Sequence, residues 1–238
     1  MLSEREEAGL LLAKKDRLDE LYRDNPWKFF CQQVRTVDES KTITGMNRDR
    51  VYNWPRDHVY LKETLKVLQN EPLVGIPKSR RMMVSWLLSA YFVWAARYQP
   101  NSAIFYMSET EQKSAFAVDK RCKFIEDNLR MPEFRLPTKT MKTKTGLVGH
   151  ITYPNESYIW ALASGGDVLR QYTATKIFID ESEFQDEAPA VVRAALPMVE
   201  NGSQLVLASS SDGPIGVLAE LAEKCGIRSY KDVRGMVA

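Results

Sequence analysis

A basic turn lies within the sequence LVGIPKSRRMMVSW, residues 73–86, between an apolar run and an apolar helical pattern. Lys78, Ser79, Arg80 and Arg81 form it. Positive charge and backbone N–H groups at a helix N-terminus are what a bound phosphate requires. We therefore expect Lys78 to reach the β- and γ-phosphates of a nucleotide, and Arg80 or Arg81 to stabilise charge on the transferring phosphoryl group. The alternative is a solvated basic loop that precedes a core helix.

The turn departs from the usual phosphate-binding signature, G-x-x-x-x-G-K-[ST]. When Ser85 is aligned with the last position of the signature, Val84 occupies the position of its lysine. Met83 then occupies the position of the second glycine, and Lys78 that of the first. The Cβ atom of Met83 restricts the backbone and its approach to a phosphate. Ser85 could complete the shell of a magnesium ion. The residues expected to contact a nucleotide here are Lys78, Ser79, Arg80, Arg81, Met82, Met83, Val84 and Ser85.

An acidic pair follows a buried strand in KIFIDESEF, residues 176–184. Apolar positions followed by Asp180 and Glu181 are typical of a Walker B motif. The aspartate at the strand end can hold magnesium, usually through water. The next carboxylate, Glu181, can orient and deprotonate a water that attacks the γ-phosphate. The alternative is a strand that ends in an acidic turn.

Regular elements must position these groups, and apolar periodicity indicates where they lie. The sequence predicts helices over residues 4–24, 55–70, 84–98, 109–128, 188–199 and 217–225, with a short helix from Pro26. It predicts strands over residues 72–76, 103–107, 147–153, 158–162, 176–180 and 204–208. Ser108 with Glu111 resembles a capping box. Residues 36–50 and 131–146 read as loops, and the strands at 147–153 and 158–162 as a hairpin.

Alternating strands and helices imply a mainly parallel sheet that is covered on both faces. Ligands of such sheets bind at the carboxyl ends of the strands. Four expected strand ends carry polar groups: residues 78–81, Ser108, residues 180–181 and residues 209–211. The fold should bring these groups together, which predicts a site there.

The composition limits the protein's class. A chain of 238 residues that is 44% hydrophobic can bury a core, and its net charge of +2 does not indicate a strongly basic nucleic-acid binder. Three widely spaced cysteines and two histidines suggest neither a disulfide framework nor a zinc centre. The charged N-terminal stretch is neither a signal peptide nor a membrane span.

The two motifs together resemble the ATPase domain of the large terminase subunit of tailed bacteriophages. In that family the lysine can stand at the front of the loop with an arginine after it, as in residues 78–85. AIFYMSETEQKSAFAVDKRCKFIEDN and ALASGGDVLRQYTATKIFIDESEF resemble the family's second strand with its helix and the segment that runs into Walker B. LVLASSSDGP resembles the coupling motif, which senses the γ-phosphate, with Ser209, Ser210 and Ser211 as candidates.

The resemblance implies an α/β P-loop NTPase fold of the additional-strand catalytic-glutamate (ASCE, RecA-like) type. The expected parts are an N-terminal helical extension or lid over residues 1–54 and an ATPase core over residues 55–238. The family's large subunits also carry a nuclease domain, which we do not expect in this chain. The implied metal ligands are Ser85 and Asp180, and the implied catalytic groups are Glu181, Arg80 and Arg81.

The implied function is magnesium-dependent ATP hydrolysis that drives double-stranded DNA into a procapsid. The implied partners are DNA, the portal protein and procapsid, a small terminase subunit and further copies of the chain in a ring, with a monomer in isolation as the alternative. No membrane partner is expected, and the expected location is the cytoplasm of an infected bacterial host. Two other functions stay open: a helicase-like P-loop ATPase, and a catalytically weak docking or assembly module.

Overall fold

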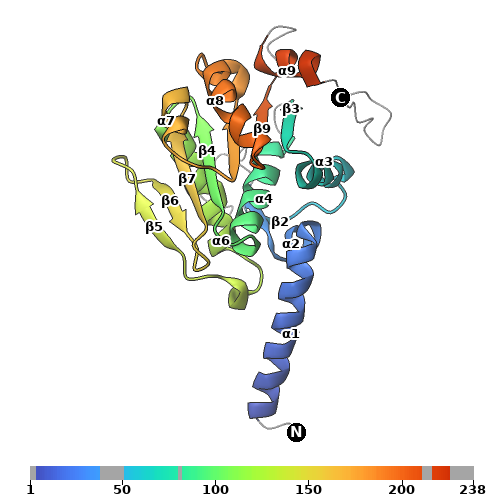
Figure 1. The fold of residues 1–238 in the computed structure, drawn as a ribbon. Coiled ribbons are helices and arrows are strands. Elements are labelled where there is room, and N and C mark those ends of the chain that lie inside the picture. The colour runs from blue at the N-terminus through green and yellow to red at the C-terminus, as the bar shows by residue number, and fades with distance from the viewer. Residues whose placement is uncertain (1–3, 38–50, 80–81, 211–215, 226–238) are drawn as a thin grey trace, which may run out of the picture.

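The computed structural model describes residues 4–37, 51–79, 82–210 and 216–225. In this part of the chain, seven strands form one sheet in the order β3-β9-β8-β4-β7-β6-β5 (Figure 1). The bounds are β3 Leu73–Pro77, β4 Ala103–Ser108, β5 Lys139–Lys142, β6 Val148–Thr152, β7 Tyr158–Ala163, β8 Lys176–Asp180 and β9 Gln204–Ser209. The strands from β3 to β7 are all parallel, and β6 and β5 are antiparallel additions.

The strand order decides which sequence motifs become neighbours. β9 lies between β3, which precedes the basic turn, and β8, which ends in the acidic pair. All three run in the same direction, so their carboxyl ends share one edge of the sheet. An extra strand between these two motif-bearing strands is the arrangement that the sequence resemblance implied.

Helices cover both faces of the sheet. Their bounds are α1 Glu4–Asp24, α2 Pro26–Gln33, α3 Val59–Asn70, α4 Val84–Tyr98, α5 Glu111–Ala117, α6 Phe124–Asp127, α7 Gly166–Arg170, α8 Ala188–Glu200 and α9 Val217–Cys225. Figure 1 shows α4 and α6 on one side of the central strands and α7 and α8 on the other. No helix in the described ranges combines the length and the apolar character that crossing a bilayer requires.

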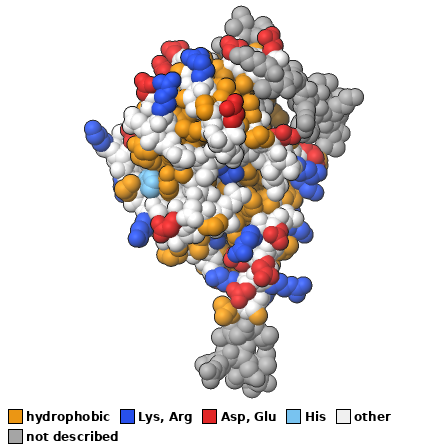
Figure 2. All heavy atoms as spheres, in the orientation of Figure 1, with side chains coloured by type: hydrophobic (Ala, Val, Ile, Leu, Met, Phe, Trp, Pro, Cys, Tyr) orange, Lys and Arg blue, Asp and Glu red, His pale blue; other side chains and the backbone are white. Residues whose placement is uncertain are grey.

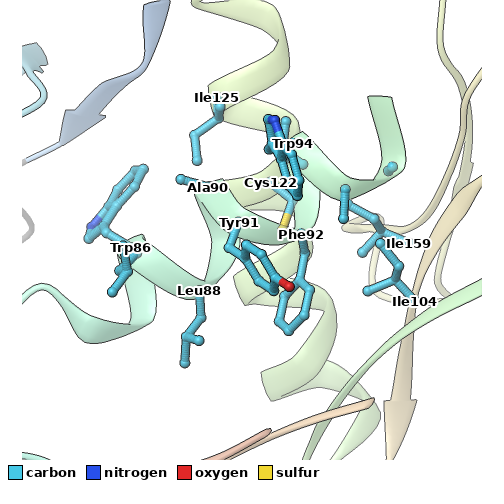
Figure 3. Packing of buried hydrophobic residues seen from close by; sticks show 14 of the residues in the cluster. Trp86, Leu88, Ala90, Tyr91, Phe92, Trp94, Ile104, Cys122, Ile125 and Ile159 are labelled. Atoms are coloured by element: carbon cyan, nitrogen blue, oxygen red, sulfur yellow. The ribbon is translucent and has the colours of Figure 1, made fainter. Parts of the chain in front are cut away.

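Alternate side chains of each central strand enter two separate cores, as the two-residue period of a strand requires. On β4, Ile104 and Tyr106 join the core beneath α4, whereas Phe105 and Met107 join the core beneath α8. β8 and β9 divide in the same way. Figure 3 shows part of the first core, where the rings of Tyr91 and Phe92 of α4 lie with centroids 5.6 Å apart. Burial on both faces explains why these strands are continuous apolar runs in the sequence.

The N-terminal helix α1 is joined to the body at its C-terminal end and extends away from it (Figure 1). The indole Nε1 of Trp94 donates to the carbonyl of Tyr22 at 2.7 Å, and the hydroxyl of Tyr98 donates to Asp19 at 2.9 Å. The helix expected at residues 4–24 is confirmed by α1, and these hydrogen bonds attach its C-terminal part to α4. The division of the chain at residue 54 stays a prediction.

Most expected elements are confirmed within a few residues, but several details were wrong. Residues 131–146 are not wholly a loop, because β5 pairs with β6. All four β5 residues are exposed, so no apolar alternation marked the strand. A short β1–β2 ribbon (Arg35–Val37 and Val51–Asn53) and α7 were also not expected, and α3 begins at Val59 rather than at residue 55.

The capping box expected at Ser108 was also wrong. Ser108 still belongs to β4, and its carbonyl accepts the backbone N–H of Ser164 at 2.8 Å. Thr110 caps α5 instead, by accepting the N–H of Lys113 at 3.2 Å. The helix expected over residues 109–128 is interrupted by a π-helical segment, Val118–Lys123. Such segments are rare and arise mostly as single turns inside α-helices.

A buried ion pair between Arg97 and Glu126 gives the first prediction. Nη1 of Arg97 lies 2.5 Å from Oε1 of Glu126, and their side chains are 3% and 1% exposed. Glu126→Ala leaves a buried guanidinium without its carboxylate and should lower the free energy of unfolding by about 3–5 kcal/mol in urea titrations. Glu63→Ala, which breaks an exposed pair with Lys66, should cost less than about 1 kcal/mol. Equal effects of the two substitutions would contradict the burial of the Arg97 pair.

Candidate active site

Lys78 is the first residue after β3 and reaches across the edge of the sheet. Its backbone N–H donates to the carbonyl of Ser209 at 2.8 Å, which continues the pairing of β3 with β9. Its Nζ lies 2.5 Å from Oε1 of Glu181 and 3.9 Å from Oδ1 of Asp180. The lysine side chain is 10% exposed. The basic turn and the acidic pair, 103 residues apart in sequence, therefore meet through a direct ion pair.

Glu181 receives its other hydrogen bonds from the end of β9. Its Oε2 accepts the backbone N–H of Ser210 at 3.2 Å, the hydroxyl of Ser210 at 3.2 Å and the hydroxyl of Ser209 at 3.4 Å. Burial raises the pKa of Glu181, but the hydrogen bonds from Lys78 and Ser210 outweigh it, so the net pKa is lowered. The carboxylate is thus held ionised, the form that can accept a proton.

Asp180 is buried between two sets of donors. Its Oδ1 accepts the backbone N–H of Glu181 at 3.1 Å and faces Lys78. Its Oδ2 accepts the hydroxyl of Tyr106 at 2.8 Å, and Nη1 of Arg121 lies 3.8 Å away. Burial raises the pKa of Asp180, and the charges of Lys78 and Arg121 oppose this without cancelling it.

Two residues of the site have left-handed backbone. Met83, the residue before α4, has φ 54° and ψ 13°, and Glu181 has φ 54° and ψ 47°. Residues with a Cβ atom rarely adopt this conformation, and such strain gathers at functional sites. Met83 stands where the usual signature has its second glycine, so the loop keeps a glycine-like conformation without the glycine.

The remaining described residues of the loop differ in what they can offer to a ligand. The side chain of Val84 is buried in the core, so only its main chain can face a ligand. Ser85 is half-buried at the start of α4, and its carbonyl accepts the hydroxyl of Ser89 at 2.8 Å. Ser79 is exposed, and the carbonyl of Met82 accepts the hydroxyl of Tyr60 at 3.1 Å. Arg80, Arg81 and Ser211 lie outside the described residues.

The structure thus brings together five of the groups predicted from strand ends: Lys78, Asp180, Glu181, Ser209 and Ser210. Ser108 instead pairs with the end of β7, where it lies opposite Ala163 and its carbonyl accepts the backbone N–H of Ser164 at 2.8 Å.

Sequence reasoning missed two residues of the site. Tyr106 gave only a weak signal, because it is one aromatic residue within the apolar run AIFYM. In the sequence, Arg121 stands with Lys113, Lys120 and Lys123 in a stretch that is typical of a solvated basic helix face. The π-helical segment changes the helical register there, and the Arg121 side chain is 15% exposed and directed to Asp180.

The donor set suits a magnesium ion that is also bound by phosphate. Mg²⁺ is usually held by one or two carboxylates together with substrate phosphates and waters. Asp180 offers one carboxylate, and Ser85 offers a hydroxyl at the start of α4. In the described ranges, no group of three or more acidic, histidine or cysteine residues could hold a metal by itself. The residues therefore fit a cation that arrives with a phosphorylated ligand.

The fold is shared with large terminases, although the sequence alone matches no known family. No protein-family profile matches the sequence, and no curated protein matches it. The structure matches the large terminase of bacteriophage HK97 with a TM-score of 0.61 and 13% identity, over 85% of this chain and 41% of that one. It matches a mutant ATPase domain of the Thermus phage P74-26 large terminase with a TM-score of 0.50 and 16% identity, over 66% of this chain and 67% of that one.

This chain has the fold of a large terminase ATPase domain. The mainly parallel sheet flanked by helices is therefore a RecA-like P-loop fold, as expected. The chain spans less than half the length of the HK97 protein. At these identities the likeness concerns the fold, and the chemistry has to be argued from the residues of the site.

The left-handed backbone at Met83 gives the second prediction. Met83→Gly should be more stable than Met83→Ala by about 1 kcal/mol, because only the alanine keeps the steric cost of positive φ. The free energies of unfolding in urea measure this difference. Lys66, an exposed residue inside α3, is the control, and there glycine should be less stable than alanine by roughly 0.5–1 kcal/mol. The same order at both positions would show that Met83 has no left-handed strain.

Proposed function

We propose that this chain is the ATPase motor of a viral DNA-packaging terminase, which hydrolyses ATP with Mg²⁺ to move double-stranded DNA into a procapsid. The observation that carries the proposal is the meeting of Lys78, Glu181 and the serines at 209–210 at one edge of the sheet. They come from the ends of β3, β8 and β9, where ligands of parallel sheets bind. The fold shared with large terminase ATPase domains supports the choice of motor.

Binding begins at the basic turn in this proposal. The N-terminus of α4 and the cations of the turn attract the phosphates of ATP. Lys78 already lies at the edge of the sheet, where it pairs with Glu181. Phosphate oxygens compete with Glu181 for the lysine and draw it toward the β- and γ-phosphates. Arg80 and Arg81 are proposed to contact the same phosphates, and one of them to stabilise the charge of the transferring group.

Glu181 acts next as the general base. Once Lys78 turns to phosphate, Oε1 of Glu181 can accept a proton from a water molecule. The oxygen of that water forms a bond to the γ-phosphorus, and the bond from that phosphorus to the bridging oxygen of ADP breaks. Mg²⁺, held by Asp180 and Ser85, would neutralise charge on the β- and γ-phosphates. The lowered pKa of Glu181 keeps it ionised for this step.

The serines at the end of β9, Ser209 and the following Ser210, connect this chemistry to movement. Ser209 and Ser210 both donate to Oε2 of Glu181, the same carboxylate whose other oxygen pairs with Lys78. A change in the Lys78 contact therefore changes the position of the carboxylate that β9 holds. We propose that this is how the phosphate state reaches the rest of the motor.

DNA contacts in such a motor need not be strong in one subunit. Figure 2 shows acidic and basic side chains interspersed over the visible face, in keeping with the net charge of +2. A ring of copies multiplies weak contacts through effective concentration. The proposed partners are thus double-stranded DNA, further copies of the chain, a portal and procapsid, and a small terminase subunit, in the cytoplasm of an infected bacterial cell.

Two substitutions test the proposed roles, and this is the third prediction. Calorimetry with Mg²⁺ and a non-hydrolysable ATP analogue should show binding to the wild type, and Lys78→Ala should weaken it at least about tenfold by removing a charge-assisted contact. Glu181→Gln should retain binding and lose turnover by roughly 10²–10⁴-fold in a phosphate-release assay.

Lys66→Ala, which removes an exposed lysine of α3, is the control and should change neither measurement. Hydrolysis should rise with double-stranded DNA and portal rather than with single strands, which separates packaging from a helicase-like activity. Undiminished turnover in Glu181→Gln would remove that residue from the role of base. Absence of nucleotide binding by the wild type would favour a docking module.

The charges of the site give the fourth prediction. Two cations, Lys78 and Arg121, lie beside the two carboxylates of Asp180 and Glu181. The formal charges of these four side chains sum to zero, so together they exert no net attraction on a divalent cation. Mg²⁺ alone should therefore show no calorimetric binding at millimolar concentration, whereas Mg²⁺ with the ATP analogue should bind. Tight binding of Mg²⁺ alone that Asp180→Asn abolishes would contradict this order of binding.

A further inference from the structure

A buried tyrosine of the neighbouring strand fixes one oxygen of Asp180. Tyr106 on β4 is fully buried, and its hydroxyl donates to Oδ2 of Asp180 at 2.8 Å. β4 and β8 are parallel neighbours in which Tyr106 is paired with Phe178, two residues before the aspartate. The two rings meet edge to face with centroids 4.7 Å apart. The ring of Tyr106 is therefore held by Phe178, and its hydroxyl has a fixed position beneath the carboxylate.

An arginine approaches the same oxygen from an unusual helical turn. Nη1 of Arg121 lies 3.8 Å from Oδ2 of Asp180, and its side chain is largely shielded from solvent. Arg121 belongs to the π-helical segment Val118–Lys123, in which the next residue, Cys122, is buried in the core. π-helical turns of this kind are frequent at functional sites. Here the turn brings a cation to the side of Asp180 that faces away from Lys78.

The opposite oxygen of Asp180 faces the basic turn. Oδ1 accepts the backbone N–H of Glu181 at 3.1 Å and lies 3.9 Å from Nζ of Lys78. The two oxygens thus have different surroundings: Oδ2 is held by the sheet interior, and Oδ1 lies on the side where phosphate would bind. A free carboxylate could rotate and exchange them, but the Tyr106 hydrogen bond makes that exchange costly inside the protein.

We propose that Tyr106, supported by Arg121, is a positioning residue that holds Oδ2 of Asp180 and thereby presents Oδ1 to the cation bound with the nucleotide. The inference rests on the proposed function, because it concerns the metal that ATP brings. Partners that orient a metal-binding group typically change metal affinity by about 10- to 100-fold when they are removed. A purely structural tyrosine would alter stability and leave metal affinity unchanged, so the two roles can be separated.

Tyr106→Phe tests the proposal, with the affinity for Mg²⁺ at a saturating non-hydrolysable ATP analogue as the readout. We expect calorimetry to show at least about tenfold weaker Mg²⁺ affinity, while the affinity for the analogue in EDTA stays that of the wild type. Tyr91→Phe is the matched control. Tyr91 is also buried and donates to the carbonyl of Leu68 at 2.9 Å, outside the metal site, so its loss should leave Mg²⁺ affinity unchanged.

A double-mutant cycle shows whether Tyr106 acts through Asp180. In the Asp180→Asn background, Tyr106→Phe should have almost no further effect on Mg²⁺ affinity, since the group that it positions has been altered. If circular dichroism shows that Tyr106→Phe is unfolded, Arg121→Lys takes its place with the same readout. That variant keeps the charge but loses the planar guanidinium, and it should weaken Mg²⁺ affinity in the same direction.

Different experimental results would overturn the proposed function and the positioning role of Tyr106. No binding of the analogue to the wild type with Mg²⁺ would overturn the proposed function. Normal binding to the wild type, with Tyr106→Phe indistinguishable from Tyr91→Phe in Mg²⁺ affinity, would overturn the positioning role alone. The positioning role would also be overturned if Tyr106→Phe weakened Mg²⁺ affinity equally in the wild-type and Asp180→Asn backgrounds. The effect of the tyrosine would then not pass through the Asp180 carboxylate.

Discussion

The ion pair between Lys78 and Glu181 is the contact on which the rest of the site depends. It joins the ends of β3 and β8 across β9, and Ser209 at the end of β9 and the following Ser210 hold the other oxygen of the same carboxylate. One glutamate thus connects three parallel strands. The pair is partly buried, where each charge needs its partner more than it would in water. A phosphate that takes the lysine must therefore disturb the glutamate.

The two cores of the sheet make this contact possible. Alternate residues of β4, β8 and β9 are buried above and below the sheet, which fixes the register of the strands and so the positions of their ends. α4 is apolar along nearly its whole length and begins beside the basic turn. The strain at Met83 and Glu181 is maintained by this surrounding packing, since a left-handed residue persists only where neighbours determine its backbone.

The sequence allowed the central sheet, and the meeting of several polar strand ends at one edge of it, to be predicted, because both depend on strong local patterns. Apolar runs that end in polar residues marked β3, β8 and β9, and the rule for parallel sheets brought their ends together. The sequence also showed that Met83 occupies the position of the signature's second glycine, where a Cβ atom restricts the backbone. That Met83 would nonetheless take a left-handed conformation could not be foreseen, because the packing around Met83 in three dimensions decides it.

Other features had no local signal. β5 is an exposed edge strand whose pairing with β6 is seen only in three dimensions. The π-helical segment shifts the register of a helix that the sequence predicts as regular over residues 109–128, and this directs Arg121 to Asp180. Tyr106 is one aromatic residue in an apolar strand, and only the neighbouring β8 reveals the carboxylate at its hydroxyl.

The most direct test of the account is a crystal structure with Mg²⁺ and a non-hydrolysable ATP analogue, in which the distance from Nζ of Lys78 to Oε1 of Glu181 is measured. That distance is 2.5 Å here. The account predicts that it lengthens beyond hydrogen-bonding range, with Lys78 on the β- and γ-phosphates and Glu181 facing a water near the γ-phosphorus. An analogue bound at this edge with the ion pair intact, or bound elsewhere, would contradict the account.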